Sequence, residues 1–423
     1  MSVVNWGRKR TERGWRCQGA RGIRTLRSFH RPIAMDSIDF DAVIVGGGLV
    51  GSSLACALAG SGLKLGLVER TRPVPAEAGG WDARVYAVSP ASEAFLRSLG
   101  AWPDDVGRLA PVTQMRIYGD RPGSTLSFSA YDAHVARLAV IVENTALMAA
   151  LRRALEAQRN LTLFSPAACA AVEWDGDGAT LRLEGGRTLR TRLLVASDGA
   201  DSWLRGQAGI AVEESGYGQT AVVANFATER EHHGTAFQWF RPEGVLALLP
   251  LPGRRASMVW SARQDWAEHL LALEPERLGC EVAGASQGML GRLTAITPPA
   301  GFPLRLIRVR RLIAPRLALV GDAAHNLHPL AGQGVNLGFQ DARELAAVLT
   351  ARGAQRDPGS NELLRRYERS RREDILAMTA ATHGLQRLFE NPAAPLAWLR
   401  NLGLNLTDHL APLKALLVRH ALG

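Results

Sequence analysis

A chain of 423 residues with 47% hydrophobic and 21% charged side chains is long enough for two lobes and is not disordered or fibrous in composition. Its net charge of +10 is concentrated in residues 1–35, which carry nine Lys and Arg side chains and one acidic side chain, so the remainder is near neutral at +2. We therefore predict no nucleic-acid binding. The four cysteines show no paired or metal-type spacing, which predicts a reducing, cytoplasmic location.

Residues 1–37 are predicted to be a basic leader outside the fold. The leader is rich in arginine but lacks the apolar core of a signal peptide. It is either an organelle transit peptide or an upstream in-frame translation before a true start at Met35. We favour the second interpretation, because Met35 leads directly into the first predicted strand.

The first predicted elements are a strand, a turn, a helix and a second strand. An apolar run at 41–45 ends in glycines, an Ala- and Leu-rich helix follows over 49–63, and a second buried strand covers 65–68. This order forms a βαβ unit and predicts an α/β fold. The charge-free stretch 42–63 is interrupted by glycines, so we predict no transmembrane segment.

A GxGxxG motif, Gly46 to Gly51, lies at this first strand-to-helix turn. Gly46 permits the tight turn, Gly48 lets a pyrophosphate approach the backbone, and Gly51 allows the helix to pack closely on the strand. Glu69 ends the second strand, where a carboxylate can accept hydrogen bonds from ribose hydroxyls. These features predict a dinucleotide site but leave NAD and FAD both open.

Short apolar runs separated by turns predict a second lobe built on an antiparallel sheet. They occupy 115–130 and 219–262, with a helix predicted over 144–158 between them. A βα pattern returns after 317 and continues into predicted helices at about 335–351 and 361–388. The dinucleotide-binding lobe is therefore predicted to be discontinuous. The predicted division is 1–37 for the leader, 38–112, 141–212 and 305–390 for the dinucleotide-binding domain, 113–140 and 213–304 for the substrate domain, and 391–423 for a C-terminal helical segment.

Two further turns that contain aspartate favour FAD. Asp198–Gly199 ends one apolar strand and Gly321–Asp322 ends another, and Asp322 can hydrogen-bond a ribityl or ribose hydroxyl. The glycines of the following run, His328–Asp341, leave room for a flat ring. The helix that begins near Val335 would direct its positive end at the negative charge of a reduced flavin.

In this order the motifs resemble the GxGxxG, DG and GD fingerprints of the aromatic-hydroxylase class of flavoprotein monooxygenases. The run HPLAGQGVNLGFQD over 328–341 resembles the H-P-x-[AG]-G-Q-G-x-N-x-G-x-x-D pattern of the ubiquinone-biosynthesis hydroxylases. Residues 82–89 resemble that family's arginine-plus-serine segment, and the resemblance runs from about residue 38 to the C-terminus. One departure is Ser197, where relatives commonly have alanine.

The resemblance implies a Rossmann-like FAD-binding lobe with an inserted antiparallel-sheet substrate lobe. It also implies a set of residues that contact FAD or lie close to it: Gly46, Gly48, Gly51, Glu69, Arg84, Asp198, Gly199, Asp322, Gly332, Gln333, Gly334, Val335 and Asn336. No catalytic residue is assigned, because the flavin carries the chemistry. His328 and Pro329 are candidates for shaping its pocket, and since His325 and His328 have no third ligand nearby we predict no metal site.

The implied activity is hydroxylation of the aromatic ring of a prenylated phenol in ubiquinone biosynthesis, through a flavin hydroperoxide formed with O2. NADH, NADPH or another donor would reduce the flavin; only one GxGxxG is present, so a nicotinamide donor would bind transiently. Two alternatives remain: a hydroxylase of a small soluble phenol, and a non-catalytic flavin-binding accessory protein of a biosynthetic complex.

Leucines recur at roughly helical spacing over 394–422. As a helix on the membrane surface this segment would suit a prenylated substrate, and it would make the protein peripheral to the inner membrane face or bring it to other ubiquinone-biosynthesis proteins. Packing against the core is the alternative interpretation, and we favour it.

Overall fold

The computed structural model describes residues 38–72, 80–120, 123–326 and 334–390, with side chains described as far as residue 380. The chain divides into two compact units, Met1–Ser37 and Ile38–Gly423. The leader and the leucine-rich segment at 394–422 lie outside the described residues, so both remain predictions.

The first sheet contains the predicted βαβ unit. β1 (Phe40–Val45) pairs in parallel with β2 (Leu65–Val68) and with β11 (Thr188–Ala196), and its apolar side chains are buried because both faces of a parallel sheet are covered. The strand order is β18-β19-β11-β1-β2-β8, with β10 and β9 extending from β11. The other strands are β8 (Leu161–Phe164), β9 (Cys169–Trp174), β10 (Ala179–Leu183), β18 (Ile313–Ala314) and β19 (Leu317–Leu319).

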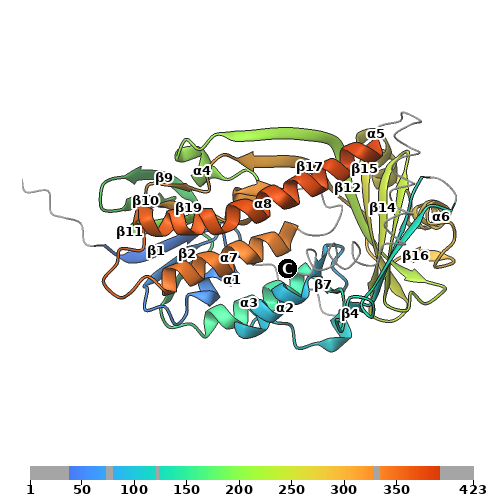
Figure 1. Cartoon of the computed structure of the whole chain (residues 1–423), viewed down its shortest axis with the longest axis horizontal. Coiled ribbons are helices and arrows are strands. Elements are labelled where there is room, and N and C mark those ends of the chain that lie inside the picture. The colour runs from blue at the N-terminus through green and yellow to red at the C-terminus, as the bar shows by residue number, and fades with distance from the viewer. Residues whose placement is uncertain (1–37, 73–79, 121–122, 327–333, 391–423) are drawn as a thin grey trace, which may run out of the picture. The chain divides into compact units, whose positions relative to one another are not determined.

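Four helices belong with this sheet (Figure 1). α1 (Leu49–Ala57) packs against α3 (Asn144–Glu156) and α7 (Gly334–Thr350), and α7 packs against α8 (Asn361–Glu390). The sequence predicted the last three helices at 144–158, 335–351 and 361–388. None of the described helices is long and apolar enough to cross a lipid bilayer.

The second sheet is mostly antiparallel, with the order β20-β17-β12-β15-β14-β13-β5-β6 and with β16 beside β12. β17 runs through the predicted boundary between the lobes at residue 304. The strands are β5 (Gln114–Tyr118), β6 (Thr125–Ser129), β12 (Val212–Thr228), β13 (Thr235–Arg241), β14 (Gly244–Leu251), β15 (Arg255–Arg263), β16 (Leu293–Ala295), β17 (Ala300–Val309) and β20 (His325–Asn326).

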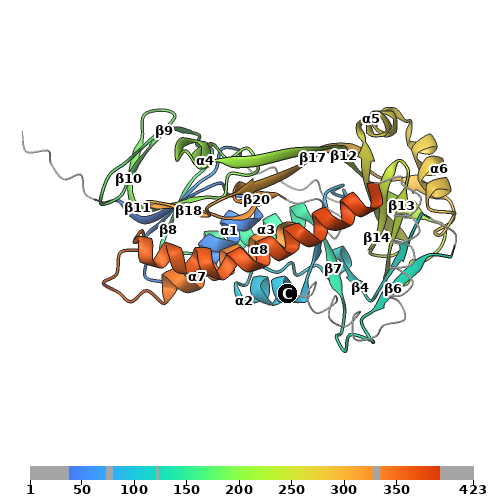
Figure 2. The same ribbon diagram turned by 45° about the horizontal axis from the view of Figure 1, so that its top comes forward.

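Two helices cover the outer face of this sheet, as Figure 2 shows. α5 (Gln264–Ala272) and α6 (Pro275–Ala285) bury Leu270 and Val282 against alternate strand residues such as Trp239 and Trp260. The opposite, inner face meets a small third sheet, which the sequence did not predict. That sheet comprises β3 (Val85–Val88), β7 (Ala139–Glu143) and β4 (Leu109–Val112).

Short helices complete the described fold. They are α2 (Pro90–Ser98), α4 (Trp203–Gln207) and the 3-10 turns η1 (Val106–Arg108) and η2 (Gly321–Ala323). The α/β class, with one mainly parallel and one mainly antiparallel sheet, is thereby confirmed.

Candidate functional site

The glycine turn between β1 and α1 is crowded at two positions and open at a third. A Cβ added to Gly46, where φ is +103°, would lie 2.3 Å from the carbonyl oxygen of Ser197, and one added to Gly51 would lie 2.0 Å from the carbonyl oxygen of Gly46. A Cβ on Gly48 would meet no described atom within 4 Å. The open space borders the first turn of α1, whose N–H groups lack intrahelical partners, so an anion fits there.

Ser197 closes this turn from the side of β11. Its hydroxyl lies 2.9 Å from the carbonyl oxygen of Val45 and 2.7 Å from that of Gly46, so that it can donate to either. The serine at this departure from the family pattern thus joins the ends of two parallel strands at the turn.

Replacing Ser197 by alanine is expected to lower the free energy of unfolding by about 1 kcal/mol, because one intramolecular hydrogen bond is lost. FAD affinity should change less than threefold, since Ser197 donates within the chain. Urea denaturation and FAD titration of the variant measure the two effects. A large loss of FAD affinity without a loss of stability would contradict this role.

Glu69 lies beside the glycine turn at the end of β2. Its Oε2 accepts a hydrogen bond from the backbone N–H of Gly47 at 2.7 Å, and its Oε1 accepts from the N–H and hydroxyl of Thr71 at 2.8 and 2.7 Å. The carboxylate is thereby held at the edge where the sequence predicts a ribose.

Asp322 lies in η2, close to α1 and α7. Gly321 has φ +60°, and a Cβ on Gly338 of α7 would lie 2.5 Å from Val50 of α1, so these segments meet closely. The Asp322 side chain is exposed, whereas Ala323 beside it is buried. Desolvation by the surrounding protein nevertheless raises the pKa of its carboxyl.

Arg84 is the charged group of the β3 segment that faces this site. Its guanidinium lies 5.4 Å from the ring centre of Tyr86 and 5.5 Å from that of Phe302 on β17. Arg84 and His325 oppose the rise in the pKa of Asp322, which puts Arg84 within electrostatic reach of that carboxylate. The predicted FAD residues Arg84 and Asp322 are therefore brought together.

Replacing Asp322 by asparagine is expected to weaken FAD binding while leaving the FAD-free protein equally or more stable. A carboxyl with a raised pKa costs stability as pH rises from its ordinary value through the raised one, and asparagine does not pay this cost. The stability of the FAD-free variant relative to the unchanged protein should therefore grow with pH over that interval. Thermal unfolding of both proteins between pH 4 and 8 measures this difference; a variant that loses stability throughout would contradict it.

The turn at Asp198–Gly199 is held by its own side chains. The Asp198 carboxylate accepts hydrogen bonds from the hydroxyl of Ser202 and, at 3.0 Å, from the N–H of Leu204, which caps α4. Arg205 is buried and donates to the carbonyl oxygens of Ala200 at 2.8 Å and Ala323 at 2.9 Å. Arg205, which the sequence did not single out, thus ties this turn to the Asp322 turn.

The described start of α7 is anchored to the β3 segment. Asn336 is buried; its Oδ1 accepts from the N–H of Ser89 and its Nδ2 donates to the carbonyl oxygen of Ala87, both at 2.9 Å. The structure therefore uses this predicted FAD residue to join α7 to β3, whereas Gly334 and Val335 lie in the first turn of α7. The candidates His328, Pro329, Gly332 and Gln333 lie outside the described residues.

A buried ion network holds the Asp322 turn through the backbone N–H of Gly321. Asp341 of α7 is fully buried and accepts hydrogen bonds from Gly321 N at 2.9 Å, His325 Nε2 at 2.6 Å and Arg371 Nε at 2.8 Å. Burial alone would raise the pKa of the Asp341 carboxyl, but His325 and Arg371 hold it below its ordinary value. Sequence reasoning left Asp341 without a role; a carboxylate on the apolar side of a helix was the available signal.

His325, which the sequence considered as one of a pair of possible metal ligands, belongs to this network through its hydrogen bond with Asp341. The described residues contain no cluster of three His, Cys, Asp or Glu side chains that could hold a metal ion.

The inner face of the second sheet is turned toward the Arg84 segment. Asn225 of β12 donates to the carbonyl oxygen of Asp82 at 2.8 Å, and Phe302 of β17, 39% exposed, lies under Arg84. Paired residues of β12 to β15 and β17 form cross-strand rows on this face: Phe240, Val245, Ser261, Ala221 and Phe302 in one row, and Gln238, Ala247, Val259, Val223 and Ala300 in the next. Neither row contains a charged side chain.

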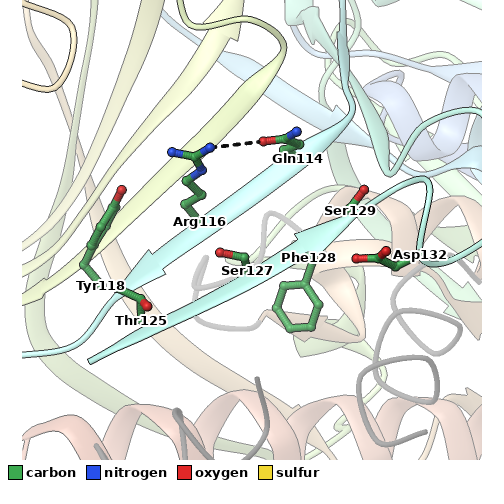
Figure 3. Close-up of a pocket in the computed structure, with 8 residues that line it drawn as sticks. All are labelled: Gln114, Arg116, Tyr118, Thr125, Ser127, Phe128, Ser129 and Asp132. Atoms are coloured by element: carbon green, nitrogen blue, oxygen red, sulfur yellow. Dashed lines mark hydrogen bonds between the residues drawn. The ribbon is translucent and has the colours of Figure 1, made fainter. Parts of the chain in front are cut away.

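A separate hollow of about 380 Å³ lies on the β5–β6 hairpin (Figure 3). Arg116, Gln114 and Tyr118 point from one side of β5, and Tyr118 stacks on Trp239 of the outer core at 5.4 Å. The hollow therefore belongs to the outer face of the sheet and is not part of the site around Asp322.

Together these features fit a dinucleotide with a flat ring. The glycine turn offers open space at a helix N-terminus, Glu69 lies at the adjacent strand end, and Arg84 lies within electrostatic reach of Asp322. The neutral sheet face would lie on the ring side of such a ligand.

Residues 39–382 match the protein family described as "FAD binding domain". Among curated proteins, a ubiquinone hydroxylase of Rhodospirillum rubrum is 40% identical over 386 residues, covering 90% of this chain and 89% of that protein. The 3-demethoxyubiquinol 3-hydroxylase of Escherichia coli is 35% identical over 386 residues, covering 90% of this chain and 98% of that protein.

Among solved structures, a probable FAD-dependent monooxygenase of Pseudomonas aeruginosa, PqsL, is similar with a TM-score of 0.72 at 25% identity. The match covers 87% of this chain and 100% of that protein. The similarity therefore includes both sheets and not the dinucleotide-binding part alone.

Proposed function

The chain belongs to the FAD-binding domain family and, within it, to the ubiquinone-biosynthesis hydroxylases, and we propose that it hydroxylates the aromatic ring of a prenylated phenol. It is an FAD-dependent monooxygenase, so its reaction requires O2 and a reduced electron donor. The proposed donor is NADH or NADPH. Bound FAD would supply the chemistry, passing one oxygen atom of O2 to the ring while the other leaves as water.

The residues proposed to hold FAD act in three places. Gly46, Gly48 and Gly51, with the N-terminus of α1, would receive the pyrophosphate, and Glu69 would accept from the ribose. Asp322 would accept from a ribityl hydroxyl beside Arg84. The run Gly332, Gln333, Gly334, Val335 and Asn336 would lie along the ring, with Asp198 and Gly199 near the donor, and with His328 and Pro329 shaping the pocket.

The inner sheet face is the observation that favours a neutral, apolar substrate. A small soluble phenol that carries a carboxylate would need a cation of its own; the two described rows contain none, and Arg84, which borders them at Phe302, is assigned to FAD. A ring with a prenyl chain instead gains from contact with Val223, Val259 and Phe302. Taking such a substrate requires access to a membrane, so we propose that the protein is peripheral to a membrane or works with other proteins of ubiquinone biosynthesis.

The test uses FAD-loaded protein with NADH or NADPH and the probe 2-geranylphenol. Consumption of O2 that depends on the probe, together with a hydroxylated product, is the expected result. Faster turnover of 4-hydroxybenzoate than of the prenylated probe would favour the hydroxylase of small soluble phenols. Flavin that is not reduced, with no O2 uptake for any phenol, would favour the non-catalytic accessory protein.

Cells that lack this protein provide a second test. They are expected to accumulate a prenylated precursor of ubiquinone that lacks one ring hydroxyl, and mass spectrometry of their lipids would identify it. Unchanged quinone levels without such a precursor would contradict the assignment to ubiquinone biosynthesis.

A further inference from the structure

Gln238 is a polar side chain of the inner sheet face, and no described residue hydrogen-bonds its amide. Gln238 of β13 is only 5% exposed. Its neighbours Phe237 and Trp239 point the other way, into the core beneath α5 and α6, so strand alternation puts Gln238 on the inner face. The amide atoms of Gln238 are not among the fully enclosed polar atoms of the described residues, so the amide keeps access to open space, where a ligand could hydrogen-bond it.

The surroundings of Gln238 are apolar and uncharged. Across its row the paired residues are Ile117 on one side and Ala247, Val259 and Val223 on the other. Ala236, the inner-face residue of β13 two positions before Gln238, packs on the third sheet. The amide is therefore the polar group that a ligand lying along this row would meet.

The other end of the row lies beside the proposed FAD site. The carbonyl oxygen of Asp82 accepts from Asn225 of β12, and the Arg84 guanidinium lies over Phe302 of β17. Asn225 and Phe302 belong to the two rows on either side of the row that contains Val223. Three strand spacings separate β12 from β13, or about 14 Å at roughly 4.8 Å per spacing. An aromatic ring between these ends would lie with Arg84 toward one side and Gln238 toward the other.

We propose that Gln238 determines substrate specificity by hydrogen-bonding the hydroxyl of a neutral phenol ring. The amide oxygen accepts from the phenolic O–H, and its N–H group can donate to the same oxygen. A neutral amide without a neighbouring cation does not compensate a carboxylate, so the residue selects a neutral hydroxyl. This inference rests on the proposed function and adds to it the residue that recognises the ring.

The experiment pairs two probes with three variants. FAD-loaded protein is titrated with 2-geranylphenol and with its methyl ether, 2-geranylanisole, and binding is measured from the change in flavin absorbance. The unchanged protein is expected to prefer the phenol about tenfold, because the ether cannot donate to the amide oxygen. In Gln238→Leu the preference should fall to about one, and Gln238→Met should behave in the same way.

Ser257→Ala is the matched control. Ser257 is fully buried on β15, and its hydroxyl is also without a hydrogen-bond partner, but it is paired with Asn225 in another row. This variant should keep the tenfold preference. A ratio of phenol to ether affinity that is the same in Gln238→Leu as in the unchanged protein would overturn the inference, even if both affinities fall.

Failure of the proposed function would look different. In that case the unchanged protein would neither bind nor hydroxylate either probe, and the substitutions would have no preference to remove. If the unchanged protein hydroxylates the phenol but Gln238→Leu keeps its preference and gains stability, the amide is a structural group satisfied by a bound water, and only the inference about Gln238 fails.

Discussion

Replacing Arg371 by methionine is expected to lower the free energy of unfolding by about 3–5 kcal/mol, because removing one partner of a buried ion pair leaves an uncompensated charge. Arg371 is 1% exposed, and its Nε donates to the fully buried Asp341 at 2.8 Å. The carboxylate would keep only His325 and the N–H of Gly321. Since Gly321 precedes Asp322, FAD retention should fall as well. Urea unfolding at pH 7.5 and the flavin content of the purified protein measure both effects.

The loss should depend on pH in a direction that identifies its cause. In the unchanged protein Asp341 has a lowered pKa, so its contribution to stability is present above the ordinary carboxyl pKa and is lost as pH falls through the lowered one. Without Arg371 the effect of burial dominates, the pKa rises, and protonation relieves the variant. Its destabilisation should therefore shrink from pH 8 to pH 5.

The exposed neighbour Arg372 provides the control for this prediction. Arg372→Met removes the same side chain from the solvent side of α8 and should change stability by less than about 0.5 kcal/mol. If Arg371→Met were equally destabilised at pH 5 and pH 8, the loss would come from packing and not from the buried charge.

Alanine at Gly51 and alanine at Gly48 are expected to have different effects. At Gly51 the added Cβ would lie 2.0 Å from the carbonyl oxygen of Gly46 and 2.4 Å from the hydroxyl oxygen of Ser197, so the turn must shift. We expect a loss of about 1–3 kcal/mol in stability and protein that purifies without flavin. At Gly48 the Cβ meets no described atom within 4 Å, so the FAD-free fold should be as stable as the unchanged protein.

Gly48→Ala should still weaken FAD binding, by tenfold or more, because the methyl group would occupy the space proposed for the pyrophosphate. Thermal unfolding of both FAD-free proteins and FAD titration by fluorescence quenching separate the two effects. Normal FAD affinity in Gly48→Ala would show that the pyrophosphate does not approach this glycine.

The sequence predicted best what depends on neighbouring residues. The turn from Gly46 to Gly51 can be recognised because its strand, glycines and helix are consecutive, and Glu69 follows at the end of the next strand. The helices at 144–158, 335–351 and 361–388 were placed to within a few residues, because their apolar periodicity is a local property.

The residues that connect distant segments could not be predicted in this way. Asn336 bonds Ser89, 247 residues earlier, and Arg371 reaches Asp341 from another helix. A buried amide or arginine looks the same in a sequence as an exposed one, since its partner is chosen by packing. The third sheet and the path of β17 across the predicted lobe boundary were missed for the same reason.

By itself the sequence determined the α/β class, the dinucleotide turn and, through the run from His328 to Asp341, the resemblance to flavin hydroxylases. Only the tertiary structure decided which side chains share the inner face of the second sheet. Strand register decides that Gln238 and Phe302 share the inner face, and a shift of one residue would turn both outward. Register depends on pairing between strands far apart in the chain, and alternation within one strand cannot reveal it.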